Sequence, residues 1–365
     1  MLRRIATGFM AAFLLSLAAF GQGQSYPPAW NPVGTYAVGD QVQLNGNIVR
    51  AIRPVNALGR FVYADWEMYY VRNNSTFLIG TQQTFATLQS AWSFFENCHI
   101  AQGATLRFYI STTHGDHSEN LYQAISLDHP SGANISIVGD DPSRITFSVT
   151  QPKTNAFELH TGHSFGALSN LTISGATCGL FATGNSTIGS ITGLHFKSCG
   201  TAIRAEMGAN LNFGANVNIS GFTLAGCEVY SGAVVSFLSG TFISGALSSG
   251  STPLTAQYGF DVEFGGELFA QHSTIEDCTV CVFVHERGLA VIDYSTLQGY
   301  STSFAALLDT SSHLSCEYAR LSVPPGAALY VGSASTVDAL NASLEGGTVV
   351  EPDSRVYTTT IDPGL

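Results

Sequence analysis

Carboxylates recur at near-constant spacing through the second half of the chain, beside one arginine and one tyrosine. Carboxylates held close together repel and raise one another's pKa. Such a group suits a general acid paired with a base, a cation site, or a row of acceptors for sugar hydroxyls. The candidate catalytic residues are Glu228, Asp261, Glu263 and Arg204. The candidate substrate-binding residues are Glu206, Tyr230, Glu286 and Asp309.

A ladder of apolar residues predicts the elements that would align these side chains. Most of its steps are 23 residues long, and one is 33. Its rungs are Phe165, Ile188, Leu211, Val235, Leu268, Val291, Leu314 and Val337. A second ladder runs eight residues upstream of each rung, and a third runs six residues upstream and is interrupted only by His285. A fixed period of this length is typical of a solenoid.

Apolar and polar residues alternate along each repeat, with glycine between the short runs. Alternation with period two predicts strands, and glycine permits the tight turns between them. We therefore expect an all-β fold, a right-handed single-stranded parallel β-helix with coils of about 23 residues. Neighbouring strands would lie about 4.8 Å apart, so the acids seven and five residues before each rung would form one outward strip. His285 is expected to face inward as a core histidine.

The strip has three interpretations. It could catalyse glycan cleavage, bind a glycan or cation without catalysis, or simply be the solvated face of a lysine-poor protein. An arginine beside carboxylates also resembles the site of polysaccharide lyases. That resemblance implies that the acids bind Ca²⁺. About ten extra residues between Ser244 and Tyr258 are expected to form a loop that walls a groove near Glu228, Asp261 and Glu263.

The N-terminus predicts export. Arg3 and Arg4 precede an apolar run from Ile5 to Phe20, followed by small residues, as in a secretory signal peptide. Retention of the same run as an anchor is the alternative, and no later run is long enough to span a membrane. The formal charge of −12 and only two lysines make nucleic acid an unsuitable partner.

Residues 26–72 are rich in aromatics and proline. The segment PPAWNPVGTYAVGDQVQLNGNIVRA, followed by ADWEMY, resembles the small chitin-binding type of carbohydrate-binding module. The resemblance implies that Trp30, Tyr36 and Trp66 bind sugar. The residues alone equally allow Trp30 and Trp66 to fill a small core.

A helix is expected over 84–102, with Phe85, Leu88, Ala91, Trp92 and Phe95 on one side. The runs TFATLQSAW, ATLRFYIS and LDHPSGANISIVGDDP resemble the opening of pectin-lyase-like β-helix proteins, both tail-spike-like and secreted bacterial ones. The resemblance implies that the helix caps the solenoid. It assigns no active site.

Three short motifs offer weaker chemistry. The His114 to His117 segment could bind a metal but fits a polar loop, and Asp140-Asp141 precedes a proline and fits a turn. The pair Cys278 and Cys281 fits packing or a disulfide better than redox or zinc chemistry. No metal residue is assigned.

The sequence thus predicts a signal peptide (1–21), a small carbohydrate-binding-like module (22–72), a linker and capping helix (73–102) and a β-helix (103–365). The expected function is an exported, glycan-engaging protein and a candidate polysaccharide hydrolase or lyase. The alternatives are a surface adhesin, a structural spacer, or a phage tail-spike-like receptor-binding protein, which would be a homotrimer. The expected partner is a polysaccharide or cell-surface glycan.

Overall fold

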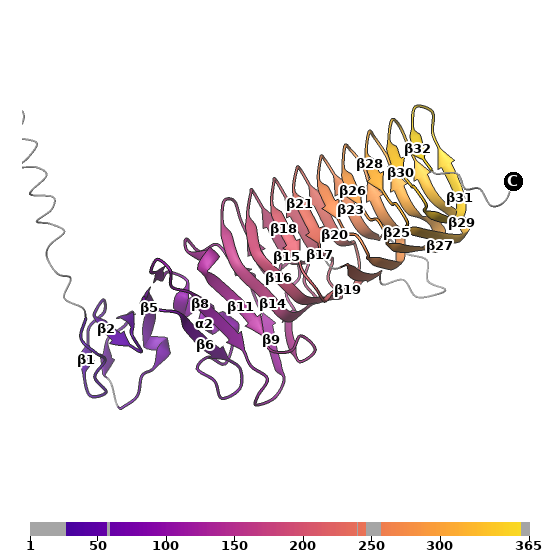
Figure 1. The fold of residues 1–365 in the computed structure, drawn as a ribbon. Coiled ribbons are helices and arrows are strands. Elements are labelled where there is room, and N and C mark those ends of the chain that lie inside the picture. Colours follow the sequence, from indigo (N-terminus) through magenta and orange to yellow (C-terminus); the bar gives the residue numbers. More distant parts are fainter. Residues whose placement is uncertain (1–26, 57–58, 239, 246–256, 359–365) are drawn as a thin grey trace, which may run out of the picture.

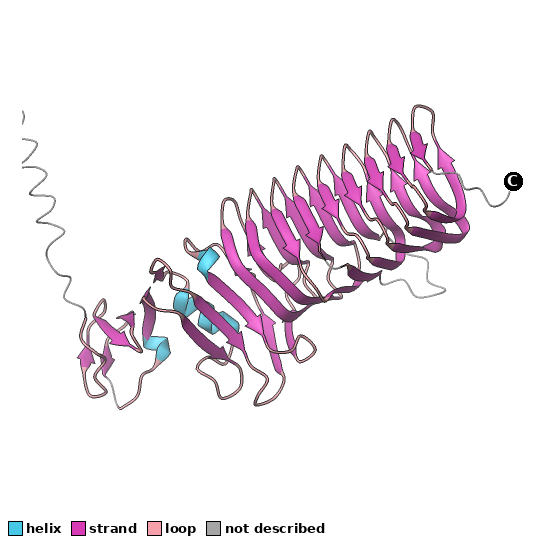
Figure 2. Cartoon of the chain, viewed as in Figure 1, coloured by secondary structure: helices cyan, strands magenta, loops and turns pink. Residues whose placement is uncertain are grey.

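Alternating apolar residues build a long parallel sheet along most of the chain. A computed structural model describes residues 27–56, 59–238, 240–245 and 257–358 (Figure 1). Within them nearly every regular element is a strand, and the few helical turns lie towards the N-terminus (Figure 2). The predicted signal peptide and most of the predicted insertion after Ser244 lie outside the described residues. No helix in the described ranges is long and apolar enough to cross a membrane.

The N-terminal unit is a small set of short strands. Its elements are β1 Thr35–Tyr36, β2 Gln41–Leu44, β3 Asn47–Ala51, β4 Val55–Asn56, the 3-10 helix η1 Tyr63–Asp65 and β5 Trp66–Val71. The predicted hairpin at Asn45-Gly46 is confirmed: both residues have positive φ, as a two-residue turn requires, and β2 pairs antiparallel with β3. The sheet continues through β5 to β7 His99–Ile100. The strand that completes it therefore comes from beyond the predicted boundary at residue 72.

A single α-helix in the described chain, α2 Leu88–Phe95, is shorter than predicted. Thr87 caps it by accepting a hydrogen bond from the backbone of Ser90. The predicted apolar side is buried as expected, and Trp92 contacts Phe108 and Phe165 of the solenoid. The helix ends early because His99–Ile100 must extend to pair with β5.

The solenoid strands pair in parallel within one sheet of 26 strands among the described residues. Up to the end of the described insertion flank they are β6 Ser75–Ile79, β8 Leu106–Ile110, β9 His117–Leu121, β10 Ile125–Ser126, β11 Ile135–Gly139, β12 Ile145–Val149, β13 Phe157–Leu159, β14 Ser164–Ser174, β15 Cys178–Thr183, β16 Thr187–Lys197, β17 Thr201–Glu206, β18 Asn210–Phe213, β19 Val217–Phe222, β20 Ala225–Tyr230, β21 Val234–Phe237 and β22 Thr241–Gly245, with the 3-10 helix η2 Gly132–Asn134 between β10 and β11. They continue as β23 Tyr258–Glu263, β24 Glu267–Phe269, β25 Thr274–Val284, β26 Leu289–Val291, β27 Thr296–Leu308, β28 His313–Ser315, β29 Arg320–Val331, β30 Thr336–Asp338, β31 Ser343–Val350 and β32 Arg355–Tyr357.

The register follows the predicted ladders through the first coils. Phe157 pairs with Leu180, Leu180 with Ile203 and Ile203 with Cys227, and all four side chains are buried. Cys227 then pairs with Phe260 across the insertion. The ladders are thus the inward rows of a parallel sheet, as the alternation predicted.

In the coil that follows Phe260 the predicted register is wrong by one residue, and from Ala306 and Leu314 onward the predicted rungs are again the inward ones. Phe260 pairs with Val282 rather than Phe283, and Leu268 pairs with Ala290 rather than Val291. This step is 22 residues, and a shift of one residue in a strand reverses which side chains face the core. The predicted inward position of His285 is therefore wrong. Val284 takes that place in the core.

All seven cysteines lie among the described residues, and each is buried with a free thiol. Burial raises the pKa of Cys98 and Cys316 to about 12. Cys227 fills an inward rung as predicted. Cys278 and Cys281 are both buried in the core with free thiols, so of the two predicted roles, packing or a disulfide, the structure shows packing.

Candidate functional site

The structure brings the four candidate catalytic residues together on neighbouring strands. Arg204 on β17 pairs in register with Glu228 on β20, and Glu228 pairs with Asp261 on β23. Tyr230 pairs with Glu263 one pleat further along the same strands. Glu206 and His285 flank these five residues. We call all seven the acidic strip: Arg204, Glu206, Glu228, Tyr230, Asp261, Glu263 and His285.

Glu228 is one of the two most enclosed carboxylic acids of the strip, with only 8% of the residue exposed. Thr201 Oγ1 donates a hydrogen bond to its Oε1 at 3.2 Å. Its Oε2 lies 3.4 Å from Arg204 Nη1 yet accepts no hydrogen bond. Burial raises the pKa of Glu228, the Asp261 charge adds to that rise, and Arg204 opposes it. Glu228 therefore keeps its proton to a higher pH than an exposed glutamate does.

Asp261 is as buried as Glu228 but has different partners. Its Oδ1 lies 3.1 Å from His285 Nε2, and the Tyr230 hydroxyl donates to its Oδ2 at 3.4 Å. His285 Nε2 also lies 3.3 Å from Glu263 Oε2. One imidazole therefore bridges two carboxylates. Neighbouring acids of the strip thus lie in unlike surroundings, which is how paired carboxylates come to hold different charges.

Burial alone would lower the pKa of His285, but its hydrogen bond to Asp261 and the charges of Asp261 and Glu263 raise it overall. Burial raises the pKa of Glu263, against the influence of His285. His285 stacks on Phe283 at a centroid distance of 4.2 Å, and Phe283 stacks on Tyr258 at 5.3 Å. This aromatic stack fixes the imidazole beside both acids.

The bridge makes stability depend on pH. Because the folded-state pKa of His285 is raised, its stabilising effect should be fully present below its ordinary pKa of 6.5 and be lost as the pH rises above that value. We expect the unfolding free energies of the wild type and His285→Gln to differ less at about pH 9 than at about pH 6. Urea titrations at each pH measure it. A difference that stays constant would contradict the bridge.

Arg204 is held by acids on two sides. Its Nε lies 2.5 Å from Glu206 Oε1, and its guanidinium carbon lies 5.0 Å above the Tyr230 ring. Although burial opposes it, the Glu206 hydrogen bond and the Glu228 charge raise the pKa of Arg204 overall. An arginine held in this way is a poor base, so the geometry disfavours the lyase role that the sequence allowed it.

Two predicted binding residues lie away from the centre of the strip. Glu286 was expected beside Glu263, but the one-residue shift gives that place to His285 and puts Glu286 in the following turn with φ of 49°. The predicted placement of Glu286 is therefore wrong. Asp309 follows β27 next to His285, and its carboxylate accepts a hydrogen bond from Thr310 N at 2.8 Å. Asp309 forms the edge of the strip.

Four further residues contribute to this site and were not predicted from the sequence: His285, Phe283, Tyr258 and Thr201. A signal for the first two was present, because Val280, Val282 and Val284 alternate and are all buried. That alternation places Phe283 and His285 on the outer face. Thr201 and Tyr258 gave no such signal, since they lie near the ends of their strands.

The predicted sugar-binding aromatics of the N-terminal unit pack against one another. Trp66 is 2% exposed, with Tyr36 edge-on at 5.1 Å and Phe61 stacked at 5.3 Å. Trp30 packs edge-on against Phe61 and is half-buried, as is Tyr36. Trp66 is thus a core residue, whereas Trp30 and Tyr36 keep part of their surface exposed.

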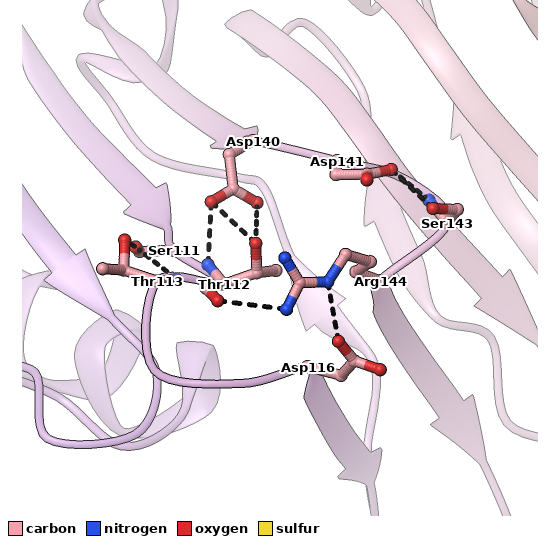
Figure 3. Close-up of polar contacts among 8 residues, drawn as sticks. All are labelled: Ser111, Thr112, Thr113, Asp116, Asp140, Asp141, Ser143 and Arg144. Atoms are coloured by element: carbon pink, nitrogen blue, oxygen red, sulfur yellow. Dashed lines mark hydrogen bonds and ion pairs between the residues drawn. The ribbon is translucent and has the colours of Figure 1, made fainter.

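The acids of the opening motifs stabilise turns (Figure 3). Asp140 accepts hydrogen bonds from the backbone and hydroxyl of Thr112, and Asp141 accepts them from Ser143. Arg144 donates to Asp116 at 2.7 Å. The turn interpretation of Asp140-Asp141 fits these bonds. In the described part of the chain, no group of three or more His, Cys, Asp or Glu residues is arranged to hold a metal ion.

Comparison with family models, with characterised proteins and with solved structures finds no match to this chain. The long parallel sheet is itself compatible with a parallel β-helix.

Proposed function

We propose that this protein engages and hydrolyses a polysaccharide at the acidic strip. The observation that carries the proposal is the pair Glu228 and Asp261, buried side by side on adjacent strands in unlike surroundings. Glu228, with its raised pKa and an oxygen that accepts no hydrogen bond, would donate a proton to the glycosidic oxygen. Asp261, next to His285, would act on the anomeric carbon or on a water.

The backbone spacing favours one stereochemical course. Neighbouring strands lie about 4.8 Å apart, close to the roughly 5 Å carboxyl separation of retaining glycosidases. On this basis Asp261 attacks the anomeric carbon, the leaving oxygen takes the proton of Glu228, and water then releases the sugar. The neighbouring residues have supporting roles. Arg204 and Glu206 would orient Glu228, Tyr230 and His285 would hold Asp261, and Glu263 would complete the His285 bridge.

The coil length and the helix cap suggest which kind of solenoid this is. Paired residues 22 to 24 apart, as in Phe157 with Leu180 and Ile203 with Cys227, fit coils of about 23 residues. We infer a right-handed single-stranded, pectin-lyase-like β-helix, capped by α2 at the end where Trp92 covers Phe108 and Phe165. Export through the N-terminal signal peptide would give the protein access to extracellular glycans.

The N-terminal unit would hold the same glycan through the partly exposed rings of Trp30 and Tyr36. Sugar rings stack on aromatic faces, and these two side chains meet that requirement where Trp66 does not. Calcium enters this proposal only if the reaction is elimination, for which Arg204 is poorly suited.

A non-catalytic adhesin or spacer is the second candidate. It is favoured by the internal pairing of the strip, in which Arg204 and His285 neutralise acids whose side chains are only about a tenth to a fifth exposed. An acidic strip whose charges are paired within the protein also suits a rigid surface structure. Under this candidate a receptor-binding homotrimer is one form the protein could take.

The test is incubation of the mature chain with plant and bacterial polysaccharides and with chitin, with and without calcium. Reducing ends and absorbance from unsaturated products are read together. We expect new reducing ends without unsaturated products. Both signals together would indicate a lyase, and binding without either signal would indicate the adhesin.

A further inference from the structure

Three shallow hollows meet on the outer face of α2, far along the chain from the acidic strip. The largest, about 490 Å³, lies between the helix and β9. It is lined by Thr87, Gln89, Ser90, Ser93, Ser118, Glu119, Asn120 and Tyr122. Apart from the carboxylate and the Tyr122 ring, these side chains are all hydroxyls and amides.

The other two hollows extend the first at both ends. One of about 370 Å³ shares Gln89 and Ser93 with it and continues to Ser126 and Glu158. The other, of about 240 Å³, shares Ser90 and Ser93 and continues to Tyr63 and Trp66 of the N-terminal unit. Ser93 lines all three hollows, and together they extend from the N-terminal unit to the first coils. We call the three hollows together the α2 groove.

The lining indicates the chemistry of its ligand. Among the described residues that line the three hollows, none is Lys, Arg or His. Glu119 is already occupied, because its two oxygens accept hydrogen bonds from Leu88 N at 2.6 Å and Gln89 N at 2.9 Å. The hydroxyls of Thr87 and Ser90 bond to each other at the start of the helix. The other hydroxyls and amides can both donate and accept, as the hydroxyls of an uncharged sugar require. An anionic glycan would find no cationic side chain in this lining and would lie near the carboxylates of Glu96, Glu119 and Glu158.

One exposed aromatic ring and one buried donor lie along the groove. Tyr122 is 65% exposed and lines the largest hollow, so its ring is open to a ligand there. At the other end Trp66 lines the smallest hollow, and its buried indole N–H has no hydrogen-bond partner among the described residues. A buried donor without a partner costs free energy.

We propose that the α2 groove binds a segment of an uncharged glycan, with a sugar ring on Tyr122 and sugar hydroxyls on the polar face around Ser93. The ligand class rests on the proposed function, but the site is separate from the acidic strip. The groove would hold the chain between the N-terminal unit and the solenoid. It would thus add binding energy without taking part in bond cleavage.

The test measures binding of chitohexaose, cellohexaose, xylohexaose and maltohexaose by calorimetry, with hexagalacturonate as the anionic probe. Ser93→Trp fills the junction of the hollows, and Tyr122→Ala removes the ring. We expect at least one uncharged probe to bind, and each change to weaken that binding about tenfold or more. Asn212→Trp and Tyr357→Ala alter exposed positions elsewhere and should leave the affinity unchanged.

Glu228→Gln separates this site from the strip, because it should stop turnover while leaving groove binding intact. Binding unchanged in both groove variants would overturn the groove proposal, whether or not the strip is catalytic. Binding of hexagalacturonate alone, or of none of the probes, would overturn it too. Melting temperatures within a few degrees of the wild type confirm that each variant is folded.

Discussion

Glu228→Gln should lower turnover on the cleaved polysaccharide by a factor of about 10² to 10⁴, with substrate binding retained. The amide has the shape of the protonated acid but cannot release a proton to the glycosidic oxygen. Glu228 is enclosed, its pKa is raised by burial, and its Oε2 accepts no hydrogen bond. The change should leave Arg204 paired with Glu206. The measurement is kcat and KM on purified protein.

Glu267→Gln is the matched control for this variant. Glu267 is an exposed glutamate on β24, outside the strip, and its replacement should leave kcat within about twofold. Turnover of Glu228→Gln within tenfold of the wild type would mean that Glu228 is not the acid. Loss of binding together with turnover would instead point to a positioning role.

Glu119→Ala should lower the free energy of unfolding by about 4 kcal/mol. Glu119 is 4% exposed on β9 and accepts hydrogen bonds from Leu88 N and Gln89 N at the start of α2, with His117 Nε2 3.3 Å away. Removing the carboxylate leaves these donors buried without an acceptor. The positive end of the helix also loses its counter charge. Urea unfolding of the full chain measures the loss.

Two milder variants set the scale for this result. Glu119→Gln keeps one acceptor oxygen and should destabilise less than Glu119→Ala, whereas Thr87→Ala removes only the cap on Ser90 N and should cost about 1 kcal/mol. A loss below 1 kcal/mol for Glu119→Ala would show that water satisfies the helix end.

The apolar ladders predicted the parallel sheet because burial gives the short strands of successive coils a period of two in the same register. Phe157, Leu180, Ile203 and Cys227 lie in one inward row, and their outward neighbours Arg204 and Glu228 could be aligned from the same spacing. Local patterning also sufficed for the Asn45-Gly46 hairpin, whose conformation depends on two residues.

The register after Phe260 could not be obtained by extending a fixed period. A coil shorter by one residue moved His285 to the outer face and Glu286 into a turn, and only the Val280, Val282 and Val284 alternation indicated it. The partners of Glu119 were out of reach for a different reason. They come from a helix about 30 residues earlier, and nothing local marks such contacts.

The most direct test of the account is the titration of the Glu228 carboxyl group itself, which requires no substrate. Carbon NMR of protein labelled at glutamate carboxyls, assigned by comparison with Glu228→Gln, would follow it with pH. The account predicts a pKa above the usual 4.5 that falls in Asp261→Asn, because the Asp261 charge helps to raise it. Titration at or below 4.5, unchanged by Asp261→Asn, would contradict an acid and base pair at the strip.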